Sequence, residues 1–137
     1  MNRDEVKSDR RYTKDHEWAM RVTGVNGDEV LVGITAFAVD QLGDITLVNL
    51  DVKAGDILTV GKAFGTIESV KTLSDLFAPL SGKVARVNPA LEEKPELIND
   101  DCWEKGWMIA LTPSAPDGLA ELLDHLAYGE LLKTASH

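Results

Sequence analysis

The chain has 137 residues, of which 44% are apolar, and its 14 Lys and Arg against 23 Asp and Glu give a net charge of −9. This balance fits one soluble globular domain with its own core, and the negative charge disfavours nucleic acids and anionic membranes as partners. No apolar run reaches the length of a membrane span. The single cysteine, Cys102, excludes an intramolecular disulfide framework and fits a reducing compartment. We therefore expect a cytoplasmic, bacterial protein with a flexible polar tail over residues 1–11.

Residues 17–34 alternate between apolar and polar side chains, as two half-buried strands joined by a tight turn do. Asn26-Gly27 is the expected turn, because both positions tolerate a positive φ. Thr35 is a suitable N-cap for a short helix that Gly43 ends. A strand rich in branched residues is expected over 45–50.

The middle of the chain predicts short strands separated by small turns, as in a compact β-barrel or sandwich. A helical turn is expected near Leu97-Ile98. Similar strand-turn material flanks Lys71 on both sides, which suggests two similar halves that meet at a hairpin with Lys71 at its tip. A lysine there has no packing role, and its amine is accessible to a modifying enzyme. The expected strands cover 57–60, 64–68, 73–77, 84–87 and 107–111.

The period of the apolar residues changes after Pro113. Ser114 or Asp117 is the expected cap of an amphipathic helix, and two later leucines extend its apolar stripe. We therefore expect one domain over residues 12–137 with a C-terminal helical segment over 114–133. The leucines at i, i+3, i+4 and i+7 are Leu119, Leu122, Leu123 and Leu126.

The central segment G-T-I-E-S-V-K-T-L-S-D-L-F-A-P-L-S-G-K-V, residues 65–84, resembles the lipoyl-lysine hairpin of the H protein of the glycine cleavage system. The resemblance extends over about residues 12–132, and several motifs in register are far more specific than one. The other matching segments are Y-T-K-D-H-E-W (12–18), V-G-I-T-A-F-A (32–38), L-G-D-I-T-L-V (42–48), V-N-P-A-L (87–91), P-E-L-I-N (95–99) and G-W-M (106–108).

This resemblance implies a mainly β fold, the barrel-sandwich hybrid of lipoyl and biotinyl carriers, with short helices and a C-terminal amphipathic helix. It implies a carrier without catalytic residues, in which lipoic acid is amide-linked to Lys71 and the cofactor supplies the reactive dithiolane. Its implied partners are a lipoyl-attaching ligase or transferase, glycine decarboxylase, a folate-dependent aminomethyltransferase and dihydrolipoyl dehydrogenase. A carrier that enters several active sites is expected to be a monomer.

The resemblance also assigns roles around Lys71. Glu68, Ser69 and Val70 are expected to mark the hairpin for the attaching enzyme, together with Asp75, although Glu68 and Asp75 also fit plain solubilising charges. His16 and Glu17 are expected to line a cleft that shelters the loaded arm. These neighbours are not expected to bind a metal, because adjacent strand residues point to opposite faces.

The sequence departs from the family pattern in two places. V-N-L-D at 48–51 replaces V-E-L-P, and Cys102-Trp103 replaces a Pro-Tyr pair; both are expected near the partner-facing or arm-holding surface. They leave open a second carrier role, that of an H-like lipoate-binding protein working with heterodisulfide-reductase-like sulfur-oxidation subunits. Cys102 would then be a redox thiol near the arm, although free cysteines are more often buried and its acidic neighbours should raise its pKa.

Two other classes of protein are compatible with fewer of these features. A small enzyme built on Cys102 and a histidine lacks any nucleophile-elbow, metal or phosphate-loop motif. An unmodified interaction module that kept the fold would leave Lys71 bare, and Lys71→Arg would then change nothing.

Overall fold

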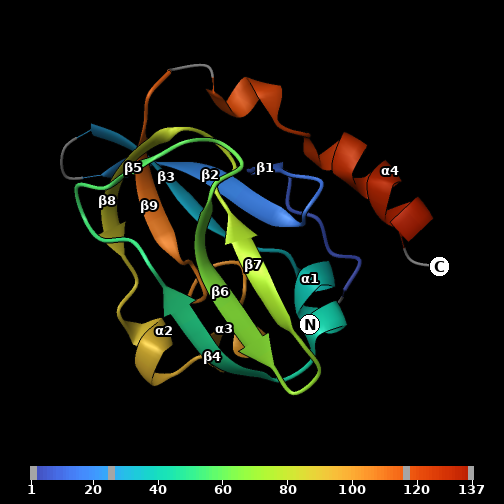
Figure 1. The fold of residues 1–137 in the computed structure, drawn as a ribbon. Coiled ribbons are helices and arrows are strands. Elements are labelled where there is room, and N and C mark those ends of the chain that lie inside the picture. Colours follow the sequence, from blue (N-terminus) through green and yellow to red (C-terminus); the bar gives the residue numbers. More distant parts are fainter. Residues whose placement is uncertain (1–2, 25–26, 116–117, 136–137) are drawn as a thin grey trace.

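Two antiparallel sheets form a sandwich-like fold in the computed structural model, which describes residues 3–24, 27–115 and 118–135 (Figure 1). The mainly β prediction is confirmed. The smaller sheet has the order β4 (Ile45–Leu50), β6 (Ala63–Ser69), β7 (Leu73–Phe77). The larger has the order β1 (Arg11–Tyr12), β2 (Glu17–Gly24), β3 (Gly27–Ile34), β9 (Ile109–Pro113), β8 (Gly82–Val87), β5 (Ile57–Leu58).

Trp18 is fully buried in β2 and shows how the strand alternation builds the core. It pairs with Gly33 on β3, and a Cβ at Gly33 would lie 2.5 Å from the indole Cζ2. Glycine at this position therefore lets the ring lie across the neighbouring strand. The indole N–H of Trp18 donates to the carbonyl of Cys102 at 3.0 Å, so the ring also anchors the loop before β9.

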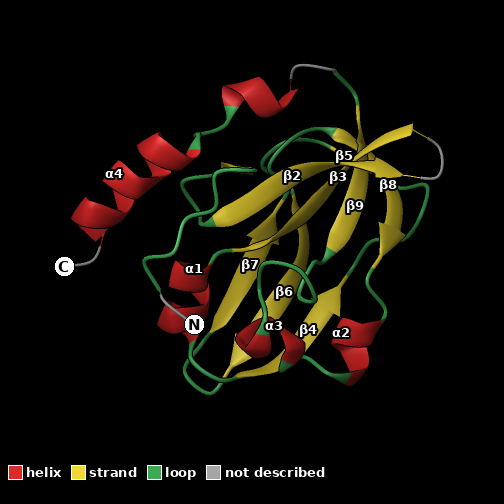
Figure 2. Ribbon diagram, turned by 180° about the vertical axis from the view of Figure 1, so that it is seen from behind, coloured by secondary structure: helices red, strands yellow, loops and turns green. Residues whose placement is uncertain are grey.

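The short helices lie at the ends of the strands (Figure 2). They are α1 (Ala36–Leu42), α2 (Ala90–Glu93) and α3 (Leu97–Asp100). Both predicted caps of α1 are confirmed: the hydroxyl of Thr35 accepts a hydrogen bond from the Ala38 N–H, and Gly43 follows the helix with φ 79°. Asn26 of the expected turn lies outside the described residues, and Gly27 has φ 109°.

The C-terminal helix is confirmed, but it begins later than the leucine pattern predicts. A 3₁₀ turn covers Gly118–Glu121, and α4 covers His125–Ala135. Between them, Leu123 exchanges both backbone hydrogen bonds with Tyr12 of β1, so its backbone forms an isolated β-bridge and does not continue a helix. Asp124 caps α4 by accepting from the Ala127 N–H at 2.8 Å.

The predicted caps and the predicted leucine stripe of the C-terminal segment have different outcomes. The N–H of Ser114 donates to the carbonyl of Ser81, and the first described helical turn begins four residues later, at Gly118. The alternative cap, Asp117, lies outside the described residues. Leu126 is 68% exposed, so the expected stripe of leucines is interrupted there.

The described part of the expected N-terminal tail packs against the body of the protein. Arg10 is buried, and its guanidinium lies over the rings of Trp18 and Trp103 at 4.6 and 5.2 Å. The hydroxyl of Tyr12 exchanges two hydrogen bonds of 2.7 Å with the backbone of Lys7. The expectation of a loose tail is therefore wrong for residues 7–10, and the ordered body begins before residue 12.

Candidate functional site

Lys71 lies at the exposed tip of the hairpin that β6 and β7 form, as the sequence predicts. Figure 1 shows these two strands of the smaller sheet. The last paired residues before the tip are Glu68 and Leu73. The neighbouring Val70 donates its N–H to the carbonyl of Asp44 at 3.0 Å. This bond ties the hairpin to the turn between α1 and β4, so Lys71 is presented at a fixed place, and its exposed side chain passes close to Gly43 of the same turn.

Ser69 organises the tip. Its hydroxyl oxygen accepts hydrogen bonds from the N–H groups of Lys71 and Thr72, at 3.1 and 3.2 Å, and its own N–H donates to the carbonyl of Thr72 at 2.8 Å. A serine side chain that accepts from the two following amides stabilises a tight turn without a glycine. The structure therefore gives Ser69 a role in the shape of the tip.

The other hairpin residues singled out by the sequence lie on the outer face of the smaller sheet. Glu68 is exposed there between its cross-strand neighbours Leu47 and Leu73, which are 45% and 59% exposed. Val70 is 67% exposed beside Lys71. An acidic group framed by exposed apolar side chains is a surface that a partner protein can recognise. Asp75 is also exposed and lies further along β7.

A cleft of about 170 Å³ lies beside β7, between that strand, α1 and the turn before β2. His16 and Glu17 line it, as the resemblance implies, and so does Asp75. Asp75 lies four residues beyond Lys71, and the part of this path within β7, from Leu73 to Asp75, is about 7 Å at the rise of a β-strand. The residues that line the cleft are Asp15, His16, Glu17, Ile34, Ala38, Gln41, Leu42, Ile67, Ser74, Asp75 and Leu76.

Glu17 is a buried carboxyl, only 3% exposed. One oxygen accepts from the hydroxyl of Thr13 at 2.8 Å and the other from the N–H of Phe77, in β7, at 3.4 Å. Burial raises the pKa of Glu17 to about 7, against the smaller opposing effect of these hydrogen bonds. A cation that entered the cleft would favour the ionised form of this carboxyl.

His16 lies on the turn before β2 in a left-handed conformation, with φ 67°. Its ring packs against Phe37 with centroids 4.6 Å apart, and Nδ1 lies 2.7 Å from the hydroxyl of Tyr128. Burial lowers the pKa of His16, which favours the neutral ring at neutral pH. The sequence did not single out Tyr128 or Thr13. The role of Tyr128 depends on a contact with His16, which is distant in the chain, and the role of Thr13 depends on a side-chain hydrogen bond to Glu17 that no sequence motif indicates.

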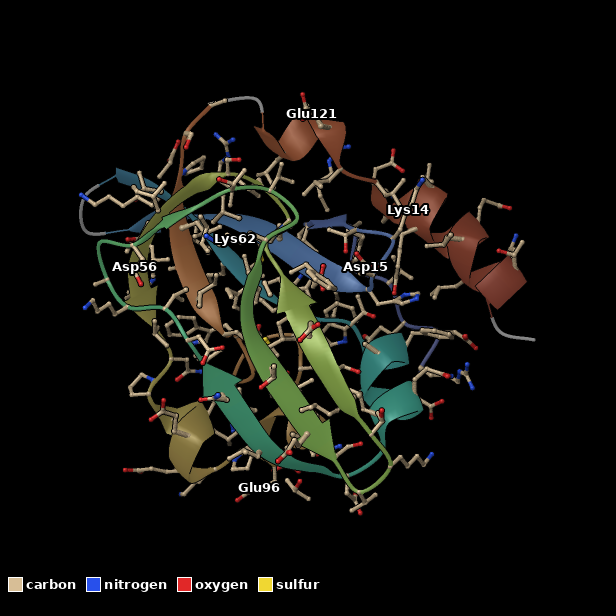
Figure 3. The ribbon with its side chains drawn as sticks, viewed as in Figure 1. Lys14, Asp15, Asp56, Lys62, Glu96 and Glu121 are labelled. Atoms are coloured by element: carbon tan, nitrogen blue, oxygen red, sulfur yellow. The ribbon has the colours of Figure 1, made fainter. Side chains whose placement is uncertain are left out.

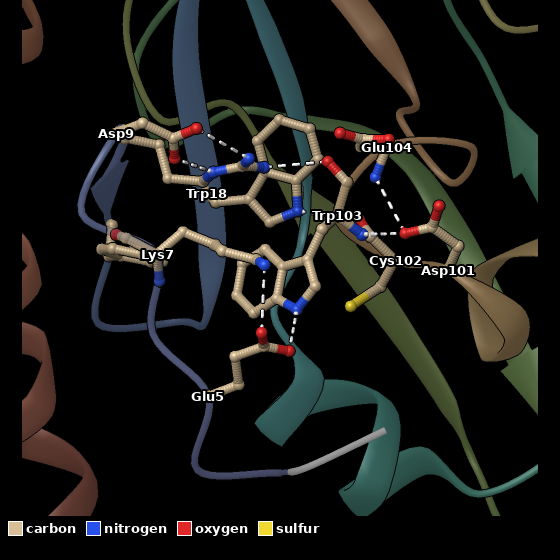
Figure 4. Close-up of polar contacts among 10 residues, drawn as sticks. Glu5, Lys7, Asp9, Trp18, Asp101, Cys102, Trp103 and Glu104 are labelled. Carbon is tan, nitrogen blue, oxygen red and sulfur yellow. Dashed lines mark hydrogen bonds and ion pairs between the residues drawn. The ribbon is translucent and has the colours of Figure 1, made fainter.

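The side chains of Cys102 and Trp103 are buried, in a loop next to the N-terminal segment (Figure 4). Burial, reinforced by the charge of Asp101, raises the pKa of the Cys102 thiol to about 12. Cys102 is not among the residues that line the cleft. The second departure from the family pattern is therefore in the interior and not on the expected surface, whereas Asn49, in the first departure, is exposed on β4.

No group of three or more His, Cys, Asp or Glu within residues 3–24, 27–115 and 118–135 is arranged to hold a metal ion. Of the labelled carboxylates, Asp56 and Glu96 lie apart from each other and from Asp15 and Glu121, which border one surface pocket (Figure 3). None of the helices in the described part of the chain is long and apolar enough to cross a membrane.

Comparisons with known proteins agree on one family. The model of the glycine cleavage H-protein matches residues 10–135. The glycine cleavage system H protein of Magnetococcus marinus is 50% identical over 125 residues, which cover 91% of this chain and 86% of that protein. The Anaeromyxobacter sp. (strain K) protein of the same name is 49% identical over 124 residues, which cover 90% of this chain and 93% of that protein.

A solved structure extends this likeness to the fold. The crystal structure of a glycine cleavage system H protein from Mycobacterium marinum superposes with a TM-score of 0.80 at 36% sequence identity. The match covers 96% of this chain and 100% of that chain.

Proposed function

The chain belongs to the glycine cleavage H-protein family, and from this membership and the geometry of the hairpin we propose that it carries a lipoyl group on Lys71. The observation that carries the proposal is the placement of this lysine. It is exposed at a tip whose backbone is held by Ser69 and Asp44. An attaching enzyme needs an accessible amine at a reproducible position, and this turn provides both.

The residues around Lys71 fit such a group. The exposed face with Glu68, Leu47 and Leu73 offers the attaching enzyme a surface next to the amine. Lipoic acid supplies a dithiolane that cycles between disulfide and dithiol. This chain then contributes position, and we propose that it has no catalytic residues of its own.

The cleft beside β7 is proposed to shelter the loaded arm. The cleft borders β7 at residues 74–76, a few residues from Lys71, so a lipoyl chain attached to the lysine side chain can reach it. Glu17 and Asp75 place carboxyl groups at the cleft, where they can accept hydrogen bonds from a protonated amine. Ile34, Ile67 and Leu76 provide apolar lining for the chain itself. The carried group is thus proposed to be an aminomethyl group.

The proposed partners are glycine decarboxylase, a folate-dependent aminomethyltransferase, dihydrolipoyl dehydrogenase and a lipoyl-attaching enzyme. The alternative role in sulfur oxidation was left open by the two departures from the family pattern, with Cys102 as its candidate redox thiol. The burial and raised pKa of Cys102 give that role no support, although it remains a separate prediction about partners. The monomeric state and the cytoplasmic location also stay predictions.

Intact mass and peptide mapping across residues 65–83 test the attachment in protein from the native host. The expected result is a lipoyl adduct that Lys71→Arg abolishes. Lys83→Arg is the matched control, because Lys83 is also an exposed lysine close to this segment and should leave the adduct unchanged. An unmodified Lys71 in an extract whose other lipoyl proteins are modified would overturn the carrier proposal.

The cargo needs a second assay. Glycine-dependent release of CO2 by a glycine decarboxylase should require the lipoylated chain and fail with Lys71→Arg. A lipoylated chain that supports no such release would remove the glycine cleavage role and leave the sulfur-oxidation role to be tested with its own subunits.

A further inference from the structure

Tyr128 is a fully buried residue of α4 whose hydroxyl is shared by two groups from elsewhere in the chain. Its oxygen lies 2.7 Å from Nδ1 of His16 and 2.8 Å from Oγ1 of Thr35. His16 belongs to the turn before β2, and Thr35 is the N-cap of α1. One hydroxyl therefore joins three separate elements in the interior.

Both partners of Tyr128 belong to segments that form the walls of the cleft. His16 lines it directly, and Thr35 begins α1, which contributes Ala38 and Leu42 to the lining. A backbone bond of 2.9 Å, from the Thr35 N–H to the His16 carbonyl, joins the same two walls. Tyr128 itself is not among the lining residues, and α4 acts on the cleft through these hydrogen bonds and through the edge contact of the Tyr128 ring with the His16 ring, whose centroids are 5.7 Å apart.

The hydrogen bonds imply one direction for the protons. Thr35 is fully buried, and within the described residues the oxygen of Tyr128 is the acceptor that lies in reach of its hydroxyl proton, so a hydrogen-bonded Thr35 hydroxyl donates to Tyr128. The proton of Tyr128 then points to Nδ1 of His16. A neutral imidazole that accepts at Nδ1 carries its proton at Nε2.

We propose that Tyr128 is a positioning residue of the arm-holding cleft, which fixes the ring orientation and the Nε2–H tautomer of His16 and ties the two walls together. The proposal depends on the proposed function, because the cleft matters only if an arm enters it. His16 needs such support, since its left-handed backbone is unfavourable for a residue other than glycine and its ring has an alternative tautomer.

The chain contains a matched control for this residue. Tyr12 is equally buried, and its ring stacks on that of Tyr128 with centroids 4.4 Å apart and planes inclined by 8°. The hydroxyl of Tyr12 bonds to the backbone of Lys7 and not to the cleft. Tyr128→Phe and Tyr12→Phe therefore each remove one buried hydroxyl from the same stack, but only the first removes a contact with His16.

The first test uses the full chain without any arm and records the ¹⁵N resonances of the His16 ring. Wild-type protein and Tyr12→Phe should show the Nε2–H tautomer. Tyr128→Phe should show a mixture of tautomers and a higher His16 pKa, because the neutral ring loses the donor at Nδ1. The charge of Asp15, which also acts on His16, is the same in all three proteins. An unchanged tautomer in Tyr128→Phe would overturn the proposal.

The second test uses the lipoylated chain loaded with an aminomethyl group and measures the spontaneous loss of that group. Tyr128→Phe should lose it about fivefold faster than wild type, the factor that one net hydrogen bond corresponds to. Tyr12→Phe should lose it at the wild-type rate. Equal acceleration in both variants would assign the effect to packing alone and refute the positioning role. A chain that takes up no lipoyl group would refute the proposed function, while the first test would still decide the state of His16.

Discussion

Glu17→Gln is expected to stabilise the protein above neutral pH and to leave its stability in acid almost unchanged. The carboxyl is buried, and its pKa is raised from 4.5 to about 7 by desolvation. Below the lower value both the folded and the unfolded chain hold the proton. As the pH rises from 4.5 to about 7, the unfolded chain releases the Glu17 proton while the folded chain still holds it. The contribution of Glu17 to the free energy of unfolding is therefore lost over this range.

The size of the effect follows from the two pKa values. The difference between 4.5 and about 7 corresponds to about 3 kcal/mol of unfolding free energy, at about 1.4 kcal/mol per pKa unit. Glutamine keeps an oxygen that accepts hydrogen bonds but has no charge to desolvate. The variant should therefore exceed wild type by up to this amount once the wild-type carboxyl is ionised, at about pH 8.

Urea unfolding of the unmodified proteins at about pH 4, pH 6 and pH 8 measures this difference, because contributions from other titrating groups cancel between the two chains. Thr13→Ala is a useful companion. It removes a hydrogen bond that lowers the pKa of Glu17 in the folded chain, so the loss of stability should begin at the same pH but extend to higher pH and become larger. A difference between wild type and Glu17→Gln that stays constant over the whole range would refute the reasoning.

Three further changes test other parts of the structure. Ser69→Ala should slow lipoyl attachment to Lys71 by about tenfold in a steady-state ligase assay while unfolding by urea changes little, because it loosens only the tip; an unchanged rate would remove Ser69 from the presentation of the lysine. The thiol of Cys102, buried and with a pKa of about 12, should react with a thiol reagent only in urea, so rapid labelling of the native protein would contradict its burial. Gly33→Ala should cost about 1–3 kcal/mol in urea unfolding, since its Cβ would overlap the ring of Trp18, and a neutral effect would show that the ring can move.

The elements that the sequence predicts best depend on neighbours close in the chain. The caps of α1 involve residues three or four positions apart, and Thr35 and Gly43 behave as predicted. The hairpin around Lys71 also depends on local alternation and a local turn, which Ser69 closes. The residues of this hairpin are one of seven motifs in register, and the seven together indicate the family.

The sequence was less informative where distant segments compete for the same groups. The leucine period predicted a helix through Leu123, but pairing with Tyr12, more than a hundred residues earlier, takes its backbone hydrogen bonds. Arg10 was assigned to a loose tail because its two aromatic partners are not its neighbours in the chain. Polar composition indicates exposure only when no such partner lies nearby in the fold.

The sequence by itself determined the strands, the capped helix and the exposed lysine, because alternation, capping and turn formation act over a few residues. Only the tertiary structure decided the cleft and its chemistry. Glu17 acquires its raised pKa from burial against β7, and His16 acquires its partner Tyr128 from a helix 112 residues away. Desolvation and long-range hydrogen bonds depend on which segments pack together in the folded chain, and local sequence patterns do not predict that packing.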